Sequence, residues 1–462
     1  MLRIRDLTND HLAFGVATSS YQIEGAVDVD GRGRSIWDTF AATPGAVADG
    51  TDGSVACDSY RRLDDDLAVI SDLGVPLYRF SVAWPRVQPA GRGPVNAAGL
   101  DYYERLVDGL LGRGVTPLLT LYHWDLPQPL EDAGGWPNRD TADRFADYAA
   151  LVHDRLGDRV GTWTTHNEPW CAAFLGYAAG VHAPGRREPA AAYAAAHHLL
   201  LGHGLAARAL RAADPGLEVG IVLNLSPAYV DQPGAEEAAQ VVDLVQNRLW
   251  LDALLHGHYP AALVARVPEL ADPALVRDGD LATIAAPLDW MGVNYYTPFR
   301  VGLPQPDAHA SVGQATDAYP GAPVCSFRPR PPLTTMGWEV HPDSLRSLLV
   351  DLSREAAGVP LMVTENGVAY PDTARADDGS VVDDDRVAYL RDHIAAVRQA
   401  QAEGADVRGY VAWSLMDNFE WGEGYTQLFG LVAVHPGTLR RVPKRSYRYF
   451  QELVRAEPVS PG

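Results

Sequence analysis

Residues 160–169 read VGTWTTHNEP and residues 360–367 read PLMVTENG, and these two stretches decide the fold. Both begin with apolar residues, and both end on a neighbouring pair of Asn and Glu. A strand that is buried on both faces has no packing reason to finish in amides and carboxylates. In a parallel barrel, however, the C-terminal ends of the strands open into a common mouth, where polar side chains are exposed to a ligand.

Short apolar runs of this kind alternate with longer helical stretches along the whole chain. The predicted strands are residues 11–19, 75–84, 115–124, 160–168, 217–225, 288–296, 360–366 and 408–415. The predicted helices are residues 64–73, 99–113, 141–156, 190–213, 241–256, 343–355 and 385–402. Eight strands with intervening helices indicate a barrel, since a doubly wound sheet usually has about five to seven strands. We predict an α/β protein with a single (β/α)8 TIM barrel domain over residues 1–462.

Long loops at the mouth of this barrel account for the rest of the chain. Residues 298–332 follow the sixth predicted strand, are rich in proline and show no periodicity. Long segments of this kind in a compact domain are usually functional. We therefore expect an irregular loop that forms a wall or a lid of the cleft.

The charge balance excludes several classes of partner. The chain has 59 acidic and 38 basic residues, which gives a formal net charge of −21. Such a surface repels nucleic acids and anionic membranes. No apolar run of about 18 residues could span a membrane, and residues 1–10 lack the apolar core of a signal peptide. The three cysteines are widely scattered, which favours a reducing compartment, so we predict a cytoplasmic protein.

Glu168 and Glu365 close two different predicted strands, so a barrel would bring both to one mouth. Two carboxyl groups at one site are what glycoside hydrolysis requires, one to protonate the leaving oxygen and one to attack or to activate water. Their environments must separate their pKa values. Arg79, near the end of the second strand, is a candidate cation for the ionised partner. The alternative is that either Glu forms a structural ion pair.

Recognition of a sugar needs aromatic faces for the ring and polar groups for its hydroxyls. The sequence places such groups at or just beyond the strand ends: Gln22, His123, Asn167, Trp413, Glu420, Trp421 and Phe429. Glu420 stands between two bulky rings, where an unpaired charge would be costly to bury. A salt bridge at the rim is the alternative interpretation of this residue.

A histidine triplet, His197, His198 and His203, raises the possibility of a metal-dependent hydrolase. The triplet lies in an Ala-rich predicted helix and not at the end of a strand. We therefore interpret these residues as surface and packing positions of an outer helix, and we predict no metal site.

These residues stand in motifs that resemble glycoside hydrolase family 1, and in particular its bacterial β-glucosidases. The resemblance runs nearly from end to end of the chain. The motifs are residues 14–25 (FGVATSSYQIEG), 78–81 (YRFS), 121–127 (LYHWDLP), 167–170 (NEPW), 294–296 (NYY), 364–367 (TENG), 413–421 (WSLMDNFEW), 429–431 (FGL) and 444–447 (KRSY).

The resemblance implies a retaining, two-step hydrolysis of terminal β-D-glucosyl residues from glucosides or oligosaccharides. Glu365 matches the nucleophile, Glu168 matches the acid and base, and Arg79 and Tyr296 match residues that contact the nucleophile. The positions that match substrate-binding residues are Gln22, His123, Asn167, Asn294, Trp338, Trp413, Glu420, Trp421 and Phe429. Among these, Asn167 would bond the 2-hydroxyl, Trp413 would be the floor under the sugar, and Trp338 would lie beside the leaving group. The family uses no cofactor and no metal.

Two alternatives on the same fold stay open. A 6-phospho-β-glycosidase resembles this chain, but it has a Ser near the position of Glu420 and a Lys that holds the phosphate. Glu420 would repel a phosphate, and Lys444 is the only Lys of the chain. A non-catalytic sugar-binding barrel would be expected to lose one of the two glutamates, and both are present. The preferred sugar among glucose, galactose and fucose, the natural aglycone and the oligomeric state cannot be predicted.

Overall fold

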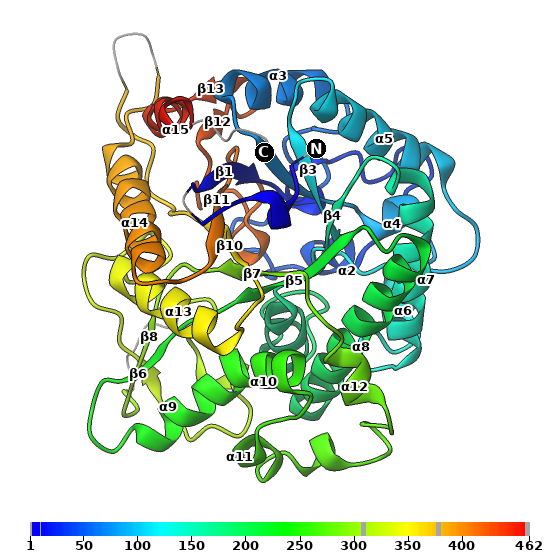
Figure 1. Cartoon of the computed structure of the whole chain (residues 1–462), viewed down its shortest axis with the longest axis vertical. Helices are drawn as coiled ribbons and strands as arrows, with labels where there is room; N and C mark the ends of the chain where they lie inside the picture. The colour runs from blue at the N-terminus through cyan, green and yellow to red at the C-terminus, as the bar shows by residue number, and fades with distance from the viewer. Residues whose placement is uncertain (1, 10, 306–310, 376–379, 458–462) are drawn as a thin grey trace.

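Eight parallel strands close into a barrel in the order β1-β11-β10-β7-β5-β4-β3-β2, and helices surround it (Figure 1). The computed structural model describes residues 2–9, 11–305, 311–375 and 380–457. The barrel strands are β1 (Ala13–Ala17), β2 (Leu77–Ser81), β3 (Thr116–Tyr122), β4 (Thr162–Asn167), β5 (Glu218–Asn224), β7 (Trp290–Asn294), β10 (Leu361–Asn366) and β11 (Val407–Trp413). Each lies inside one predicted strand or within one residue of it, so the prediction of a (β/α)8 TIM barrel is confirmed.

The longer helices follow the strands in sequence and pack outside them. They are α3 (Leu63–Leu73), α5 (Ala97–Leu111), α7 (Asp140–Leu156), α8 (Pro189–Ala213), α10 (Leu249–His256), α13 (Pro342–Glu355), α14 (Asp384–Ala402) and α15 (Arg445–Ala456). The helix predicted over residues 241–256 is interrupted, because α9 (Glu236–Asp243) leads through a π-helical turn, η3 (Leu244–Arg248), into α10. Helix α15 was not predicted; it packs against α14 and α3.

Shorter helices lie in the loops. They are α1 (Ser20–Ile23), α2 (Ile36–Ala41), α4 (Trp84–Val87), α6 (Gln128–Asp132), α11 (Ala261–Val264) and α12 (Asp280–Ile284). A second π-helix, η2 (Cys171–Ala179), follows β4, and short 3-10 turns are η1 (Ile4–Asp6), η4 (Pro268–Ala271), η5 (Thr316–Ala318) and η6 (Trp421–Glu423).

Burial explains why the strands read as apolar runs. Every residue of β3 and of β10 is buried, because one face of each strand packs inside the barrel and the other packs under helices. The regular pairing of the strands shifts between Val363 and Glu365 and between Thr164 and Asn167. Irregularities of this kind re-aim side chains. Here they lie where the two candidate catalytic strands reach the mouth.

The Pro-rich segment 298–332 is not irregular throughout, as the sequence led us to expect. It contains β8 (Phe299–Gly302) and β9 (Ser326–Phe327), which form a small sheet with β6 (Ala228–Val230). Residues 306–310 of the segment lie outside the described residues. These strands pair only with one another, so they produce no long apolar run that a sequence pattern could reveal. A further two-stranded sheet joins β12 (Val432–Val434) to β13 (Arg441–Pro443).

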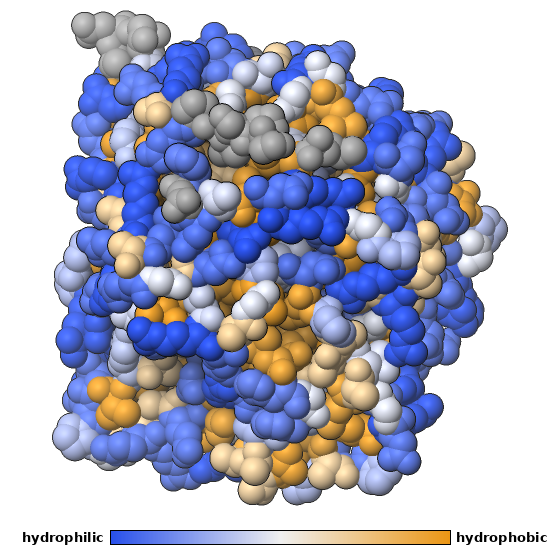
Figure 2. Space-filling model, viewed as in Figure 1, coloured by the Kyte–Doolittle hydropathy of each residue, from blue (hydrophilic) through white to orange (hydrophobic). Residues whose placement is uncertain are grey.

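Hydrophilic side chains cover most of the face in Figure 2, and hydrophobic residues reach that surface in smaller patches. This distribution agrees with the net charge of −21. In the part of the chain that the structure describes, no helix is both long enough and apolar enough to cross a membrane.

Candidate active site

A cavity of about 870 Å³ opens at the C-terminal ends of the barrel strands. Most of the sequence-predicted site residues line it: His123, Glu168, Asn294, Tyr296, Trp338, Glu365, Trp413, Glu420, Trp421 and Phe429. They come from the ends of five barrel strands and the loops that follow them. Residues far apart in the sequence therefore meet in one cleft, at the end of the barrel where active sites form.

The other three predicted residues, Gln22, Arg79 and Asn167, lie behind the wall of this cavity. None of the three is among the described residues that line it, and each is at most 1% exposed. Their side chains instead contact residues that do line it. In this structure they support the site and do not face it.

Glu365 is held by two donors at the end of β10. Nη1 of Arg79 donates to its Oε1 at 2.5 Å, and the hydroxyl of Tyr296 donates to its Oε2 at 2.8 Å. Burial raises the pKa of Glu365, but the Arg79 charge and both hydrogen bonds oppose that shift. The ionised form of this carboxyl is thus directly stabilised.

Glu168, just after β4, has weaker partners. Nδ2 of Asn294 donates to its Oε1 at 2.7 Å, and the thiol of Cys171 donates to its Oε2 at 3.4 Å. Burial, followed by the negative charge of Glu365, raises the pKa of Glu168 to about 8. No cation of the described residues forms an ion pair with it, so Glu168 keeps its proton at neutral pH and Glu365 ionises first.

An amide network joins the two carboxyl groups. Oδ1 of Asn167 accepts from Nη2 of Arg79 at 2.6 Å and from Nδ2 of Asn294 at 3.1 Å. Nδ2 of Asn167 lies 3.0 Å from Nε2 of His123. Burial and the Arg79 charge lower the pKa of His123 well below its usual range, so its ring is neutral and Nε2 can accept this bond. Arg79 thus orients the supporting amide as well as Glu365.

The opposite wall of the cavity is aromatic and carries a third carboxyl group. The Trp413 and Trp421 rings both stack near-parallel to the His123 ring, with centroids 5.9 and 6.0 Å from it. Burial and the charges of the two catalytic candidates raise the pKa of Glu420 to about 8. Its Oε2 accepts from Nε2 of Gln22 at 3.3 Å. The wall therefore offers stacking faces together with one acceptor that changes charge near neutral pH.

Three of the eight non-glycine residues with positive φ in the described part of the chain lie at this cleft. Trp124, Glu168 and Trp421 have φ values of 74°, 45° and 49°, in the left-handed region that non-glycine residues rarely adopt. All three line the cavity. Such strain persists only where surrounding contacts impose it, and it is typical of functional sites. For Trp124 one such contact is the bond from its Nε1 to the carbonyl of Asn167, 3.0 Å long.

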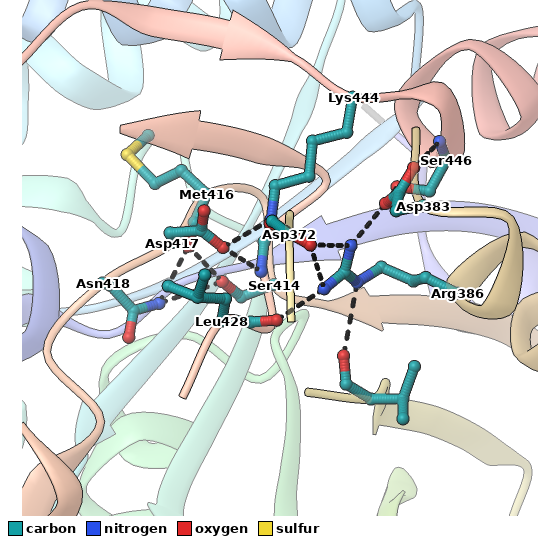
Figure 3. A network of polar contacts seen from close by, with 12 residues as sticks. Asp372, Asp383, Arg386, Ser414, Met416, Asp417, Asn418, Leu428, Lys444 and Ser446 are labelled. Carbon is teal, nitrogen blue, oxygen red and sulfur yellow. Dashed lines mark hydrogen bonds and ion pairs between the residues drawn. The ribbon is translucent and has the colours of Figure 1, made fainter. Parts of the chain in front are cut away.

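The loop that carries Glu420 and Trp421 is anchored from behind by a buried group of charges (Figure 3). Lys444 is 0% exposed, and its Nζ donates to Oδ1 of Asp417 at 2.7 Å. The same carboxyl oxygen accepts from the backbone N–H of Gly430 at 2.9 Å. Asp417 thus ties together the two ends of the loop between β11 and β12.

Further charges extend this group toward α14. Lys444 also pairs with Asp372, and Arg386 pairs with both Asp372 and Asp383. Nη2 of Arg386 donates to the carbonyl of Leu428 at 2.6 Å, directly before the cavity residue Phe429. We refer to these five residues as the ion cluster: Asp372, Asp383, Arg386, Asp417 and Lys444.

Sequence reasoning missed part of the cavity lining. Cys171, Asn224, Ser226 and Phe299 all line the cavity. Two signals could have found the first two residues. Asn224 ends β5 in the same way that Asn294 ends β7, and Cys171 comes three residues after Glu168. Phe299 lies in the segment that lacked periodicity, so nothing in the sequence assigned it to the site.

The histidine triplet lies on α8, away from the cavity lining. His197 lies 2.7 Å from the hydroxyl of Tyr259 and 3.0 Å from Asp280, and His198 and His203 are likewise buried and hydrogen-bonded. The interpretation as packing residues is confirmed. The expectation that some would lie on the surface is not met.

A parallel (β/α)8 barrel whose mouth holds two buried carboxyl groups, one paired with an arginine and one with an amide and a thiol, has the architecture of a glycoside hydrolase. The sequence model of the family described as "Glycosyl hydrolase family 1" matches residues 5–458. The chain belongs to this family.

Its relatives match over almost the whole chain. Thermostable β-glucosidase B of Thermobispora bispora is 48% identical, over 98% of this chain and 92% of the relative. A bifunctional β-D-glucosidase/β-D-fucosidase of Bifidobacterium breve is 47% identical, over 96% of each chain. The crystal structure of psychrophilic β-glucosidase BglU from Micrococcus antarcticus superposes with a TM-score of 0.92 at 44% identity, over 99% of this chain and all of that one (100%). The protein is thus a β-glucosidase of family 1.

Proposed function

We propose that Glu365 is the nucleophile and Glu168 the acid and base of this β-glucosidase, which hydrolyses terminal β-D-glucosyl residues with retention. One observation carries the assignment: the two carboxyl groups share a cavity but have unequal partners. Glu365 is paired with Arg79 at 2.5 Å, while Glu168 accepts, among the side chains that the structure describes, only from an amide and a thiol. The nucleophile must be ionised and the acid protonated, and this asymmetry supports that division.

In the first step, an oxygen of Glu365 attacks the anomeric carbon of the sugar. The bond from that carbon to the leaving oxygen breaks, and Glu168 gives its proton to this oxygen. In the second step, the ionised Glu168 takes a proton from water, whose oxygen attacks the same carbon and releases Glu365. Two inversions at one carbon give net retention. Atoms and charge balance, because one water is consumed and Glu168, which gives one proton to the leaving oxygen and takes another from water, ends protonated as it began.

For the sugar, we propose that the aromatic wall and its carboxyl group form the binding surface. Trp413 provides the floor, and His123, Glu420 and Trp421 meet the hydroxyls, with Phe429 at the edge. Gln22 orients Glu420 from behind. The name of the Bifidobacterium breve relative supports fucosides as a second class of substrate to test.

Asn167 and Asn294 are proposed to act on the substrate from beside the catalytic pair. Asn294 lines the cavity. Asn167 lies behind the wall, and its Nδ2 has a second hydrogen besides the one directed to His123. Trp338 also lines the cavity and contacts Tyr296 and Phe429, with centroids 5.4 and 6.3 Å away. This position suits a ring beside the leaving group.

A 6-phosphorylated substrate is disfavoured by the same geometry. Four carboxyl groups are among the described residues that line the cavity: Glu168, Glu365, Glu420 and Glu423. Lys444, the only lysine of the chain, is buried and pairs with Asp372 and Asp417. We propose a small neutral β-glucoside or oligosaccharide as substrate, with no cofactor, nucleic acid or membrane as partner. The barrel strands span Ala13 to Trp413, which supports one domain over the whole chain. All three cysteines are free thiols, which supports a cytoplasmic location.

The assignment is tested with two variants and azide. We expect Glu365→Gly to hydrolyse aryl β-glucosides at least roughly 1000-fold more slowly. Added azide should restore turnover and give the α-glucosyl azide, because only one displacement remains. Glu168→Ala should retain more activity on substrates with good leaving groups than on those with poor ones, and azide should give the β-glucosyl azide. Full activity of Glu365→Gly without azide, or the same azide anomer from both variants, would contradict the assignment.

A further inference from the structure

We propose that Cys171 is a positioning residue that sets the proton affinity of Glu168. The inference rests on the role proposed above for Glu168. Cys171 opens the π-helix η2, three residues after Glu168, and its backbone N–H donates to the carbonyl of Glu168 at 3.0 Å. Backbone and side chain of these two residues therefore meet in one tight turn.

The side-chain contact is specific. Sγ of Cys171 lies 3.4 Å from Oε2 of Glu168, and Nδ2 of Asn224 donates to the same sulfur at 3.6 Å. Because Asn224 occupies the sulfur as a donor, the thiol hydrogen is directed to Glu168. Asn224 at the end of β5 thus donates to Cys171, and Cys171 donates to the proposed acid, Glu168.

The thiol is able to donate at every pH at which the enzyme works. Burial, and then the charge of Glu168, raises the pKa of Cys171 well above its usual range, so the sulfur stays protonated. Cys171 is 7% exposed and lines the cavity. The S–H group therefore lies next to Oε2 of Glu168, whereas Asn294 contacts the other oxygen, Oε1.

The direction of its influence follows from this geometry. A donor to a carboxylate oxygen stabilises the ionised form and lowers the pKa of that carboxyl. Burial and Glu365 raise the pKa of Glu168 to about 8, and the Asn294 hydrogen bond, the thiol and the Arg79 charge oppose them. A residue that must be acid in one step and base in the next needs a proton affinity near the working pH. A thiol is a weak donor, so it moves this balance by a small amount.

The first test measures the alkaline limb of kcat/KM against pH for an aryl β-glucoside. Cys171→Ala removes the donor, and we expect the limb to move up by about half a pH unit, in line with the modest net strength of such a bond. Cys171→Ser keeps a hydroxyl donor, and its limb should stay at or below that of the wild type. Cys325→Ala is the matched control, because this buried thiol contacts Thr316 instead of a carboxyl group. An unchanged or lowered limb in Cys171→Ala would overturn the proposal.

A second test does not depend on catalysis. The S–H stretching band of Cys171, assigned by its loss in Cys171→Ala, should shift across the pH range in which Glu168 titrates. In Glu168→Gln the band should no longer move with pH. If the band moves with pH in the wild type but Glu168→Gln keeps full activity, the contact between Cys171 and Glu168 is retained and the acid role of Glu168 is rejected. A band that does not move in the wild type would reject the inference itself.

Discussion

The catalytic mouth and the ion cluster each bring three carboxyls together, but the two groups are neutralised differently. In the mouth, Glu168, Glu365 and Glu420 share one cation among the described residues, Arg79, which pairs with Glu365. Burial and mutual repulsion raise the pKa of Glu168 and of Glu420 to about 8. One cation cannot neutralise three ionised carboxyls, and protonation of Glu168 and Glu420 relieves the repulsion between them.

In the ion cluster, every carboxyl has a cation within contact distance. Lys444 pairs with Asp372 and Asp417, and Arg386 pairs with Asp372 and Asp383. Backbone groups and Ser446 complete these bonds. The comparison teaches that burial alone does not make a carboxyl catalytic. What differs is that the three carboxyls of the mouth share one cation, whereas each carboxyl of the ion cluster contacts Lys444, Arg386 or both.

The largest effect should come from removing one arginine from each region. Arg79→Met leaves Glu365 without its cation, so its pKa rises and the nucleophile is protonated at neutral pH. We expect kcat/KM to fall by roughly 1000-fold or more, because the proposed nucleophile reacts only in its ionised form and Arg79 is the cation that stabilises this form. Steady-state kinetics at pH 7 with an aryl β-glucoside measure this loss.

Arg386→Met is the matched variant in the ion cluster. It should lower the free energy of unfolding by about 3–5 kcal/mol, while kcat/KM per folded molecule stays within about tenfold of the wild type. Denaturant unfolding and active-site titration separate the two quantities. Equal losses of activity in both arginine variants would break the comparison between a catalytic and a structural cluster.

A smaller effect is expected within the ion cluster when both partners of a pair are removed. Lys444→Met leaves the carboxylate of Asp417 buried without a close cation, and should cost about 3 kcal/mol of stability. Adding Asp417→Asn removes that charge, and we expect the double variant to recover about 1–2 kcal/mol. The measurement is a double-mutant cycle in denaturant unfolding. If the two losses simply add, the pair does not act as a unit.

Removing a charged group from the mouth should raise the free energy of unfolding, whereas removing one from the ion cluster should lower it. The pKa of Glu420 is about 8 in the folded protein, above its ordinary value of 4.5. Its contribution to stability is therefore complete below pH 4.5 and is lost as the pH rises through 8. Glu420→Gln abolishes this loss, so at pH 8 the variant should be more stable by roughly 1–2 kcal/mol. Unfolding at pH 4 and at pH 8 tests this, with no difference expected at pH 4.

The same variant should bind the sugar poorly. We expect kcat/KM, measured above pH 8 where Glu420 is ionised, to fall by roughly 100-fold, since hydrogen bonds to a charged acceptor are the strong ones. Glu423, a neighbouring carboxyl at the cavity, provides the control variant Glu423→Gln, for which we expect a smaller change. A Glu420→Gln enzyme with unchanged kcat/KM would show that this carboxyl does not hold the substrate.

The sequence predicted the barrel well because its strands are buried on both faces and so read as apolar runs with polar ends. The small sheet of β6, β8 and β9 escaped prediction because its strands are short and pair only with one another. The helix α15 carried a usable signal, since Tyr447, Phe450 and Val454 recur at helical spacing and are buried.

The candidate site was predictable where its residues end strands or stand in motifs, as Glu168 and Glu365 do. The ion cluster was not, because Asp372, Arg386 and Lys444 are separated by long stretches and each resembles a solvated surface charge. Only the folded chain shows that they meet. Cys171 lay beside a recognised motif, yet the sequence does not reveal that its thiol meets Glu168.

The smallest effect is expected for an ion pair that is exposed. Arg354 and Asp351 lie 3.4 Å apart on α13, and their side chains are 70% and 77% exposed. Water screens this pair, so Asp351→Ala should change the free energy of unfolding by less than about 0.5 kcal/mol and leave kcat/KM unchanged. Denaturant unfolding in low and in high salt measures it. A loss of unfolding free energy as large as that of Arg386→Met would mean that pairing itself, and not burial, sets the cost of breaking a charge pair in this protein. The contrast between mouth and ion cluster would then need another cause.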